Sequence, residues 1–239
     1  MTADMVMQVI ANRSGAEPEL SLDRLMELTP EHKLSGRNSS KADVLFYRVG
    51  DLDIALKTYA DRGLLVRGLL GRWLIGREAL AYRAASGIPG IPGFLGRFGP
   101  HALATEWLPA TSLVERQGEK IDPMVFDRVE EIIDALHDRG VAVADLHRGD
   151  ILLSNDGEVY LVDLAAAWVL GSAPGRLRKA VFDHLCRLDR IALARVRTHF
   201  LGGDVDAAVR EIGGSTVAWH RWGRRLKRVW DRLRGRGAK

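Results

Sequence analysis

The chain has 239 residues, 46% of them hydrophobic, so it is long and apolar enough to bury the core of one large or two small domains. Its formal net charge of +4 is mild but unevenly distributed, because residues 221–239 are dense in arginine and lysine. The single cysteine, Cys186, excludes an internal disulfide and a cysteine-based metal cluster and favours a reducing compartment.

Residues 1–40 are polar and are broken by prolines and glycines, so we expect an N-terminal extension with little core of its own. Its start lacks the basic residues and the continuous apolar run of a secretory signal. The most apolar stretch, residues 63–75, is interrupted by Arg67 and Arg72 and falls short of the roughly 20 apolar residues that span a bilayer. We therefore expect a cytoplasmic protein.

Two short runs with strand character lie at residues 44–49 and 53–58, on either side of a turn that contains Gly50. Valine, isoleucine and aromatic residues are enriched in strands, and a glycine between two such runs is typical of a hairpin. The sequence therefore predicts a β-hairpin that ends near Lys57.

A helix is predicted at residues 74–85, where it carries Glu78, and a strand follows at residues 102–107. The next helix is the most clearly signalled one in the chain. Asp122 can cap its first turn, apolar residues recur at helical spacing, and Gly140 ends it. Mostly strands thus come first and mostly helices later, which predicts an α+β protein with two lobes.

A second hairpin is predicted at residues 151–162, because its centre, Asn155-Asp156-Gly157, is an Asp-Gly turn signal. Asp150 comes just before the first strand of this hairpin and Asp163 just after the second. Paired strand ends lie side by side, with facing Cβ atoms about 5 Å apart, so we expect the two carboxylates to converge. Two carboxylates at one place suit Mg²⁺, which proteins hold with one or two carboxylates and substrate phosphates.

A third carboxylate, Asp145, stands five residues before Asp150 in the same loop. It is placed to orient or deprotonate an attacking hydroxyl. A lone aspartate in a loop is more often a turn or cap residue, but three acids in this arrangement favour a site.

The run Asp145-Leu146-His147-Arg148-Gly149-Asp150, followed by Asp163-Leu164-Ala165, resembles the catalytic loop and metal-binding segment of protein-kinase-like enzymes. The Asp-x-His form of the loop is most similar to small bacterial members, including lipopolysaccharide-core sugar kinases and RIO-like kinases. The resemblance implies a small β-rich N-terminal lobe and a shortened, mostly helical C-terminal lobe. It also implies that ATP and Mg²⁺ are used, with Asp145 as catalytic base and Asp150 and Asp163 as metal ligands.

The N-terminal half supplies matching partners. Ile54-Ala55-Leu56-Lys57 resembles the kinase strand whose lysine contacts the phosphates of ATP, and Glu78 stands where the ion-pair partner of that lysine is expected. Glu106-Trp107-Leu108 occupies the place of the hinge, so the backbone of Glu106 and Leu108 is expected to meet adenine. The implied units are residues 1–40, 41–108, 109–214 and 215–239, namely the extension, the two lobes and a C-terminal helix.

Three positions depart from the kinase pattern. Val143 replaces a histidine, Asp150 replaces the metal-binding asparagine, and Ala165 replaces a glycine. The function favoured by the sequence is transfer of a phosphoryl group from ATP to a hydroxyl, for example on a sugar or on a glycolipid such as lipopolysaccharide core. A protein serine/threonine kinase and a catalytically impaired, nucleotide-binding pseudokinase remain alternatives.

Residues 215–239 predict a basic amphipathic helix, with Trp219, Trp222 and Leu226 at helical spacing among arginines. Such a helix suits the headgroup region of an anionic membrane, which would place the protein peripherally on the cytoplasmic face of the inner membrane. Packing of the helix on the rest of the chain is equally compatible. Nucleic acid is the less favoured partner, since no base-reading motif accompanies these charges.

Overall fold

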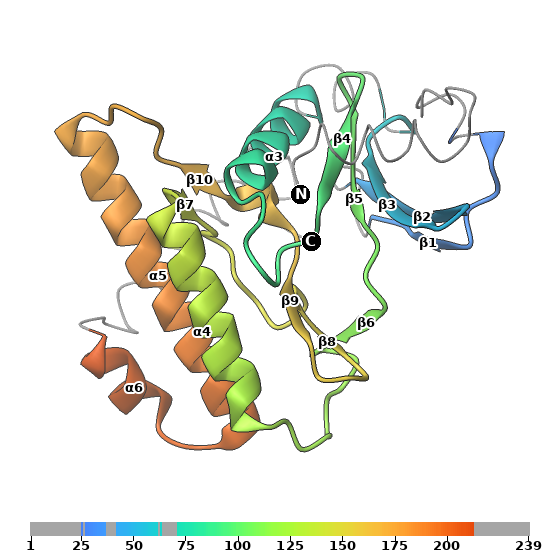
Figure 1. The fold of residues 1–239 in the computed structure, drawn as a ribbon. Helices are drawn as coiled ribbons and strands as arrows, with labels where there is room; N and C mark the ends of the chain where they lie inside the picture. Colours follow the sequence, from blue (N-terminus) through green and yellow to red (C-terminus); the bar gives the residue numbers. More distant parts are fainter. Residues whose placement is uncertain (1–24, 26, 37–41, 62, 64–70, 213–239) are drawn as a thin grey trace, which may run out of the picture.

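A computed structural model describes residues 25, 27–36, 42–61, 63 and 71–212. Within these residues the protein has a mixed α/β composition, with an antiparallel sheet built from the N-terminal half and helices dominating the C-terminal half (Figure 1). This order agrees with the sequence prediction and is compatible with a kinase-like fold. The predicted C-terminal helix and most of the predicted N-terminal extension lie outside the described residues.

The main sheet is antiparallel and has the strand order β1-β2-β3-β5-β4. Its strands are β1 His32–Leu34, β2 Asp43–Val49, β3 Leu52–Thr58, β4 Phe94–Phe98 and β5 Ala102–Glu106. Side chains alternate along β3, where Ile54, Leu56 and Thr58 are buried on one face and Lys57 points to the other. The predicted first hairpin is therefore present, with ends that differ by one residue.

Two strands of this sheet, β1 and β4, were not predicted. All three residues of β1 are exposed, and β4 contains Gly96 next to a shift in register with β5. Neither segment has the alternation of apolar and polar residues on which strand prediction depends. Because β1 pairs with β2, the sheet begins before residue 41, inside the segment that the sequence analysis treated as an extension.

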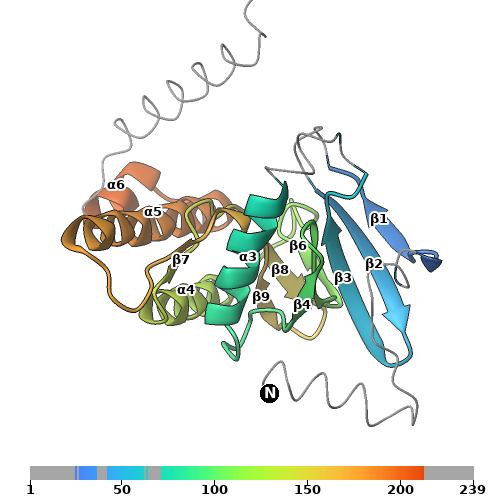
Figure 2. The ribbon, with the colours of Figure 1, turned by 90° about the horizontal axis from the view of Figure 1, so that it is seen from above.

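Helix α3, Arg72–Ala84, lies between the sheet and the C-terminal half of the chain (Figures 1 and 2). Its buried residues recur at helical spacing and face both β4 and the short 3₁₀ helix η2, Leu164–Ala166. It begins two residues before the predicted start.

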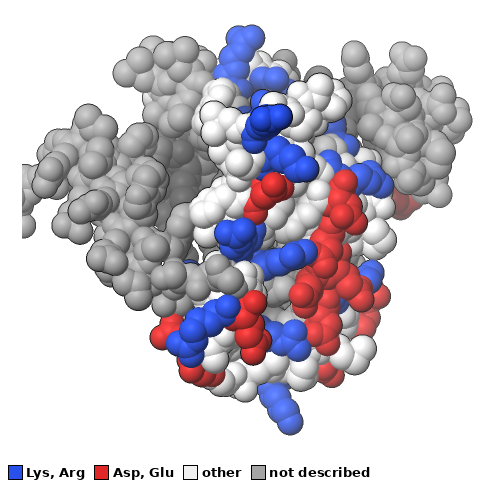
Figure 3. Space-filling model, turned by 90° about the vertical axis from the view of Figure 1, so that its left-hand side faces the viewer, with Lys and Arg blue, Asp and Glu red and all other residues white. Residues whose placement is uncertain are grey.

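Helices α4, Pro123–Asp138, and α5, Arg176–Leu201, pack side by side, and the short helix α6, Val205–Glu211, lies against α5 (Figure 1). The Asp122 side chain accepts a hydrogen bond of 2.9 Å from the backbone N–H of Met124, which is the predicted cap. Acidic side chains form a stripe on the face of the molecule seen in Figure 3. Between the two long helices, Asp134 of α4 pairs with Arg190 of α5 at 2.9 Å. In the described part of the chain, no helix combines the length and the apolar character needed to cross a membrane.

Two small sheets complete the fold. One contains β6 Ala110–Ser112, β8 Ile151–Ser154 and β9 Val159–Leu161, and the other pairs β7 Val141–Ala142 with β10 Trp168–Val169. Strands β8 and β9 form the predicted second hairpin, with Ile151 opposite Leu161.

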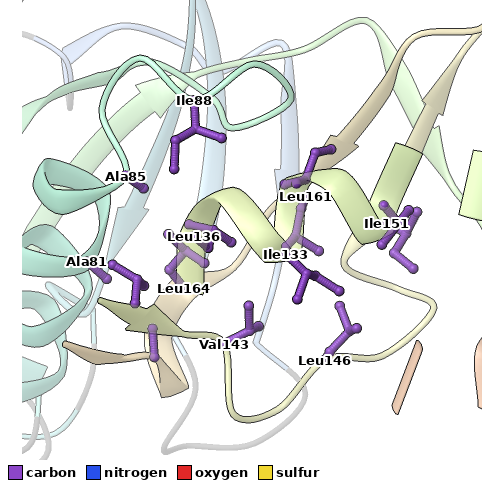
Figure 4. Close-up of a cluster of buried hydrophobic side chains, with 14 of the residues drawn as sticks. Ala81, Ala85, Ile88, Ile133, Leu136, Val143, Leu146, Ile151, Leu161 and Leu164 are labelled. Atoms are coloured by element: carbon purple, nitrogen blue, oxygen red, sulfur yellow. The ribbon is translucent and has the colours of Figure 1, made fainter. Parts of the chain in front are cut away.

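A buried apolar cluster lies beneath the segments that carry the three acids. Leu146, Ile151 and Leu164, which directly follow Asp145, Asp150 and Asp163, all belong to it (Figure 4). Each acid is therefore next to an anchored side chain, so the core fixes the backbone from which the carboxylates project.

Candidate functional site

Three residues that are far apart in the sequence meet at the ammonium group of Lys57. Its Nζ lies 2.9 Å from Oε1 of Glu78 on α3 and 2.9 Å from Oδ1 of Asp163, which follows β9. Glu78 is 2% exposed, so the Lys57–Glu78 pair is largely removed from water. The structure thus brings together one lysine and two of the acids that the sequence singled out.

The charges of this cluster support one another. Burial alone would lower the pKa of Lys57, but the facing carboxylates of Glu78 and Asp163 outweigh burial and raise it. Burial also raises the pKa of Glu78, and the ammonium group of Lys57 opposes that effect. Lys57 therefore stays positively charged, and its charge compensates the buried Glu78 carboxylate.

Helix α3 also holds the segment around Asp163. The backbone N–H of Asp163 donates to the hydroxyl of Tyr82 at 3.3 Å, and Arg77 donates to the carbonyl oxygens of Ala166 and Ala167 at 3.0 Å each. Asp163 itself has a left-handed backbone conformation, with φ of 64°. A non-glycine residue adopts this conformation at a cost, and these contacts hold it there. The sequence analysis did not identify Arg77 or Tyr82.

Asp150 lies beside Asp163, as the hairpin geometry predicts. The backbone N–H of Val162 donates to the carbonyl oxygen of Asp150 at 2.9 Å, which joins the two strand ends directly. Asp150 is 5% exposed and its Oδ2 accepts from the backbone N–H of His147 at 3.1 Å. Burial, together with the negative charges of Asp163 and Asp145, raises the pKa of Asp150 to about 8. A bound cation would relieve this repulsion.

The short turn between Asp145 and Asp150 is closed by its own hydrogen bonds. The backbone N–H of Asp150 donates to the carbonyl oxygen of His147 at 3.0 Å, and the N–H of Gly149 donates to Nδ1 of the same histidine at 3.1 Å. A Cβ atom at Gly149 would lie 3.0 Å from the imidazole ring, which favours glycine there. His147 thus supports the loop.

The backbone just before Asp145 is fixed by a residue that the sequence analysis missed. The Asp189 carboxylate on α5, 1% exposed, accepts from the backbone N–H groups of Val143 at 2.8 Å and Ala144 at 2.7 Å, and from Nε2 of His137 at 2.9 Å. Ala144 has φ of 68°, so these bonds hold a strained residue. This tether uses only the backbone of Val143, so it does not need the histidine that the kinase pattern has there. Asp145 is exposed next to it.

The donor set fits Mg²⁺ held by two carboxylates. Asp150 and Asp163 offer hard oxygen ligands from adjoining strand ends, and no group of three or more His, Cys, Asp or Glu placed to hold a metal occurs among the described residues. Mg²⁺ usually keeps several waters and uses substrate phosphates as further ligands, so two protein carboxylates are an ordinary complement for it.

The expected hinge residues lie at the end of β5, apart from the lysine cluster. The backbone N–H of Glu106 donates to the carbonyl oxygen of Gly93 at 2.8 Å, and its side chain accepts from the N–H of Gly93 at 2.9 Å. The carbonyl oxygen of Leu108 accepts from Ala110 at 2.8 Å. Contact of Glu106 and Leu108 with adenine therefore stays a prediction.

Comparison with known proteins gives one relevant similarity. No family model matches the chain. Over 119 residues, or 50% of its length, the chain is 29% identical to the lipopolysaccharide core heptose(II) kinase WaaY of Escherichia coli (strain K12). The aligned region covers 42% of that protein, less than half of its length. The comparison thus supports a kinase-type phosphotransferase in general and does not establish a substrate.

Proposed function

We propose that this chain is an ATP-dependent phosphotransferase with a two-lobed, protein-kinase-like fold that transfers the γ-phosphoryl group of ATP to a hydroxyl. The observation that carries the proposal is the position of Lys57 Nζ, 2.9 Å from both Glu78 and Asp163. A lysine that bridges a buried glutamate on a helix and the acid after a small hairpin is the arrangement that kinase-type phosphoryl transfer requires. The similarity to a heptose kinase agrees with it.

In the proposed reaction, Asp145 accepts the proton of the acceptor hydroxyl while the oxygen of that hydroxyl forms a bond to the γ-phosphorus. The bond from that phosphorus to the bridging oxygen breaks, and ADP leaves. Lys57 binds phosphate oxygens, and Glu78 keeps the lysine in place. Asp150 and Asp163 would hold Mg²⁺, which would supply positive charge at the phosphates. Leu108 and the remaining polar groups of the Glu106 backbone meet adenine.

The proposed acceptor is a sugar or a glycolipid. The support is the similarity to a lipopolysaccharide core heptose(II) kinase, a protein whose acceptor is a sugar. A protein serine/threonine kinase is the second candidate, and no comparison links the chain to one, so the sugar acceptor is favoured.

A nucleotide-binding and turnover assay tests the proposal. Wild-type protein is expected to bind Mg-ATP and to release ADP when a sugar or core oligosaccharide acceptor is supplied, whereas Asp145→Ala binds but does not turn over and Asp163→Ala loses Mg²⁺-dependent binding. Absence of Mg-ATP binding by the wild type would refute the proposal that the chain is an ATP-dependent enzyme. Binding without turnover on any acceptor of a broad panel would instead support the pseudokinase, which the replacements at Asp150 and Ala165 favour.

Residues 215–239 are proposed to bring the enzyme to an anionic membrane surface, peripherally on the cytoplasmic face of the inner membrane. The support is the sequence pattern alone, tryptophans at helical spacing among arginines. Full-length protein is expected to sediment with vesicles containing anionic phospholipid, and protein that ends at residue 214 is expected to remain in solution. Equal sedimentation of the two proteins would refute this role.

A further inference from the structure

We propose that Arg148, Arg195 and His199 form a binding site for an anionic group, phosphate or carboxylate, carried by the acceptor molecule. This inference rests on the proposed function and adds to it a chemical property of the substrate. The site lies beside Asp145, because Arg148 is three residues further along the same loop.

The central observation is a close contact between two basic side chains. The guanidinium NH1 of Arg148 lies 2.7 Å from Nε2 of His199, near the end of α5. Arginine is always charged and only donates, so a cationic group meets the imidazole ring of His199 at this contact. Among the described residues, neither partner has a carboxylate within ion-pair distance. Two bases facing each other without an acid attract an anion.

Two neighbouring arginines of α5 pair with acids, unlike the Arg148–His199 contact. Arg190 pairs with Asp134 and Arg197 pairs with Asp127, each at 2.9 Å, across to α4. Arg195 lies four residues before His199 and therefore one turn earlier on the same face of α5, which makes it the candidate for a second guanidinium of the site. Arg190 and Arg197 thus pair with acids of α4, whereas His199 contacts Arg148 of the loop.

The loop that carries Arg148 and the ring of His199 are both held by neighbouring groups. The turn that carries Arg148 is closed by hydrogen bonds of His147, and the ring of His199 packs edge-on against Phe200 at 5.0 Å between centroids. Phe200 in turn packs against Phe126 of α4. A site held by packed neighbours loses little freedom when it binds a ligand.

The spacing sets the size of the acceptor. Three peptide steps separate Asp145 from Arg148, so their Cα atoms are at most about 11 Å apart. One sugar unit can therefore present its hydroxyl to Asp145 while an anionic substituent on it or on its neighbour reaches Arg148. A basic residue near the C-terminal end of a helix interacts favourably with the helix dipole, which accounts for His199 in the last turn of α5. The dipole does not account for the contact of Arg148 with His199.

The test uses inorganic phosphate as the probe and full-length protein with isotopically labelled histidine. The protein has seven histidines in all. A non-hydrolysable ATP analogue and Mg²⁺ are present, so that phosphate does not enter the nucleotide site. The His199 imidazole signal, assigned with His199→Gln, is followed by NMR as phosphate replaces chloride at constant ionic strength. We expect a saturable shift of this signal as phosphate binds, and at least a tenfold weaker phosphate affinity in Arg148→Gln.

Arg128→Gln is the matched control, since Arg128 lies on α4 beside Glu131 and loses the same charge. It is expected to bind phosphate as the wild type does, and Arg148→Lys is expected to fall between wild type and Arg148→Gln. Absence of a saturable shift, or equal affinities in Arg148→Gln and Arg128→Gln, would overturn the site. Because this readout does not involve turnover, it is independent of the assay for the proposed function.

Acceptor trials then identify the source of the anion. A phosphorylated sugar, a uronic acid and the corresponding neutral sugar are compared by KM with wild type and Arg148→Gln. A lower KM for the phosphorylated sugar identifies phosphate and a lower KM for the uronic acid identifies carboxylate, provided that Arg148→Gln removes the preference. Equal KM values for all three sugars would contradict an anionic acceptor.

Discussion

Replacement of Asp189 by asparagine tests how the loop that carries Asp145 is held. The Asp189 side chain is 1% exposed and accepts three hydrogen bonds, two of them from the backbone of Val143 and Ala144 and one from His137. Asparagine has the same shape but offers one NH₂ group in place of one acceptor oxygen. Whichever way the amide turns, a backbone N–H of Val143 or Ala144 faces another donor.

The expected loss of stability follows from that one mismatch. A buried N–H without an acceptor costs about 1–3 kcal/mol. His137 does not add to the loss if its ring changes tautomer and accepts from the new amide. We therefore expect Asp189→Asn to lower the free energy of unfolding by about 1–3 kcal/mol, and Asp189→Ala to lower it by about 3–5 kcal/mol because every acceptor is then removed.

Urea denaturation followed by circular dichroism measures this loss, and Asp134→Asn provides the control. Asp134 lies between the same two helices and pairs with Arg190 at 2.9 Å, but its side chain is 49% exposed. An exposed pair of this kind contributes about 0–1 kcal/mol. If Asp189→Asn and Asp134→Asn destabilise the protein equally, the buried tether does not hold the loop in the way described.

Three further predictions concern other parts of the fold. Lys57→Met leaves Glu78 buried without its partner and is expected to destabilise the protein by about 3–5 kcal/mol, whereas adding Glu78→Leu restores most of the loss; urea denaturation of the single and double variants checks this. Gly90→Ala is expected to cost about 2 kcal/mol or more in the same assay, because φ there is 90° and a Cβ would lie 2.9 Å from Cγ1 of Ile132 and 3.0 Å from a backbone oxygen. A loss below 0.5 kcal/mol would show that this turn relaxes easily. Burial and two nearby aspartates raise the pKa of the Cys186 thiol to about 12, so only about one thiol in ten thousand is ionised at pH 8. Alkylation of native protein by iodoacetamide should therefore be slow and accelerate about tenfold per pH unit between pH 7 and 10, and rapid alkylation at pH 7 without denaturant would contradict the thiol's environment.

The sequence predicted those parts of the site that depend on local geometry. The Asp-Gly turn fixes the second hairpin, and the hairpin then places Asp150 and Asp163 at adjoining strand ends, a relation that the Val162–Asp150 hydrogen bond shows directly. The strand that carries Lys57 and the helix that carries Glu78 were also predictable. Apolar residues recur at strand spacing in the first segment and at helical spacing in the second.

What the sequence did not predict are contacts between distant segments. Asp189 occupies an apolar position of α5, seven residues after Phe182 and four before Leu193, and an acid on the buried face of a helix is a signal that was available. Arg77 gave no such signal, because arginines are common on exposed helix faces and its acceptors are backbone carbonyl groups of a different segment. Strand β1 was missed because its three exposed residues depend on pairing with β2 and carry no pattern of their own.

If the proposed function is correct, the contacts of α3 assemble the site before nucleotide binds. The same helix supplies Glu78 to Lys57, Tyr82 to the backbone of Asp163 and Arg77 to the carbonyl groups that follow. Moving α3 away would separate Glu78 from Lys57 and break a pair that is largely shielded from water, a change that costs several kcal/mol. Since Lys57 also touches Asp163 at 2.9 Å, a phosphate group can take over that second contact while the first is kept. Phosphate binding would thus exchange one partner of a lysine that is already in place, and no helix would have to move.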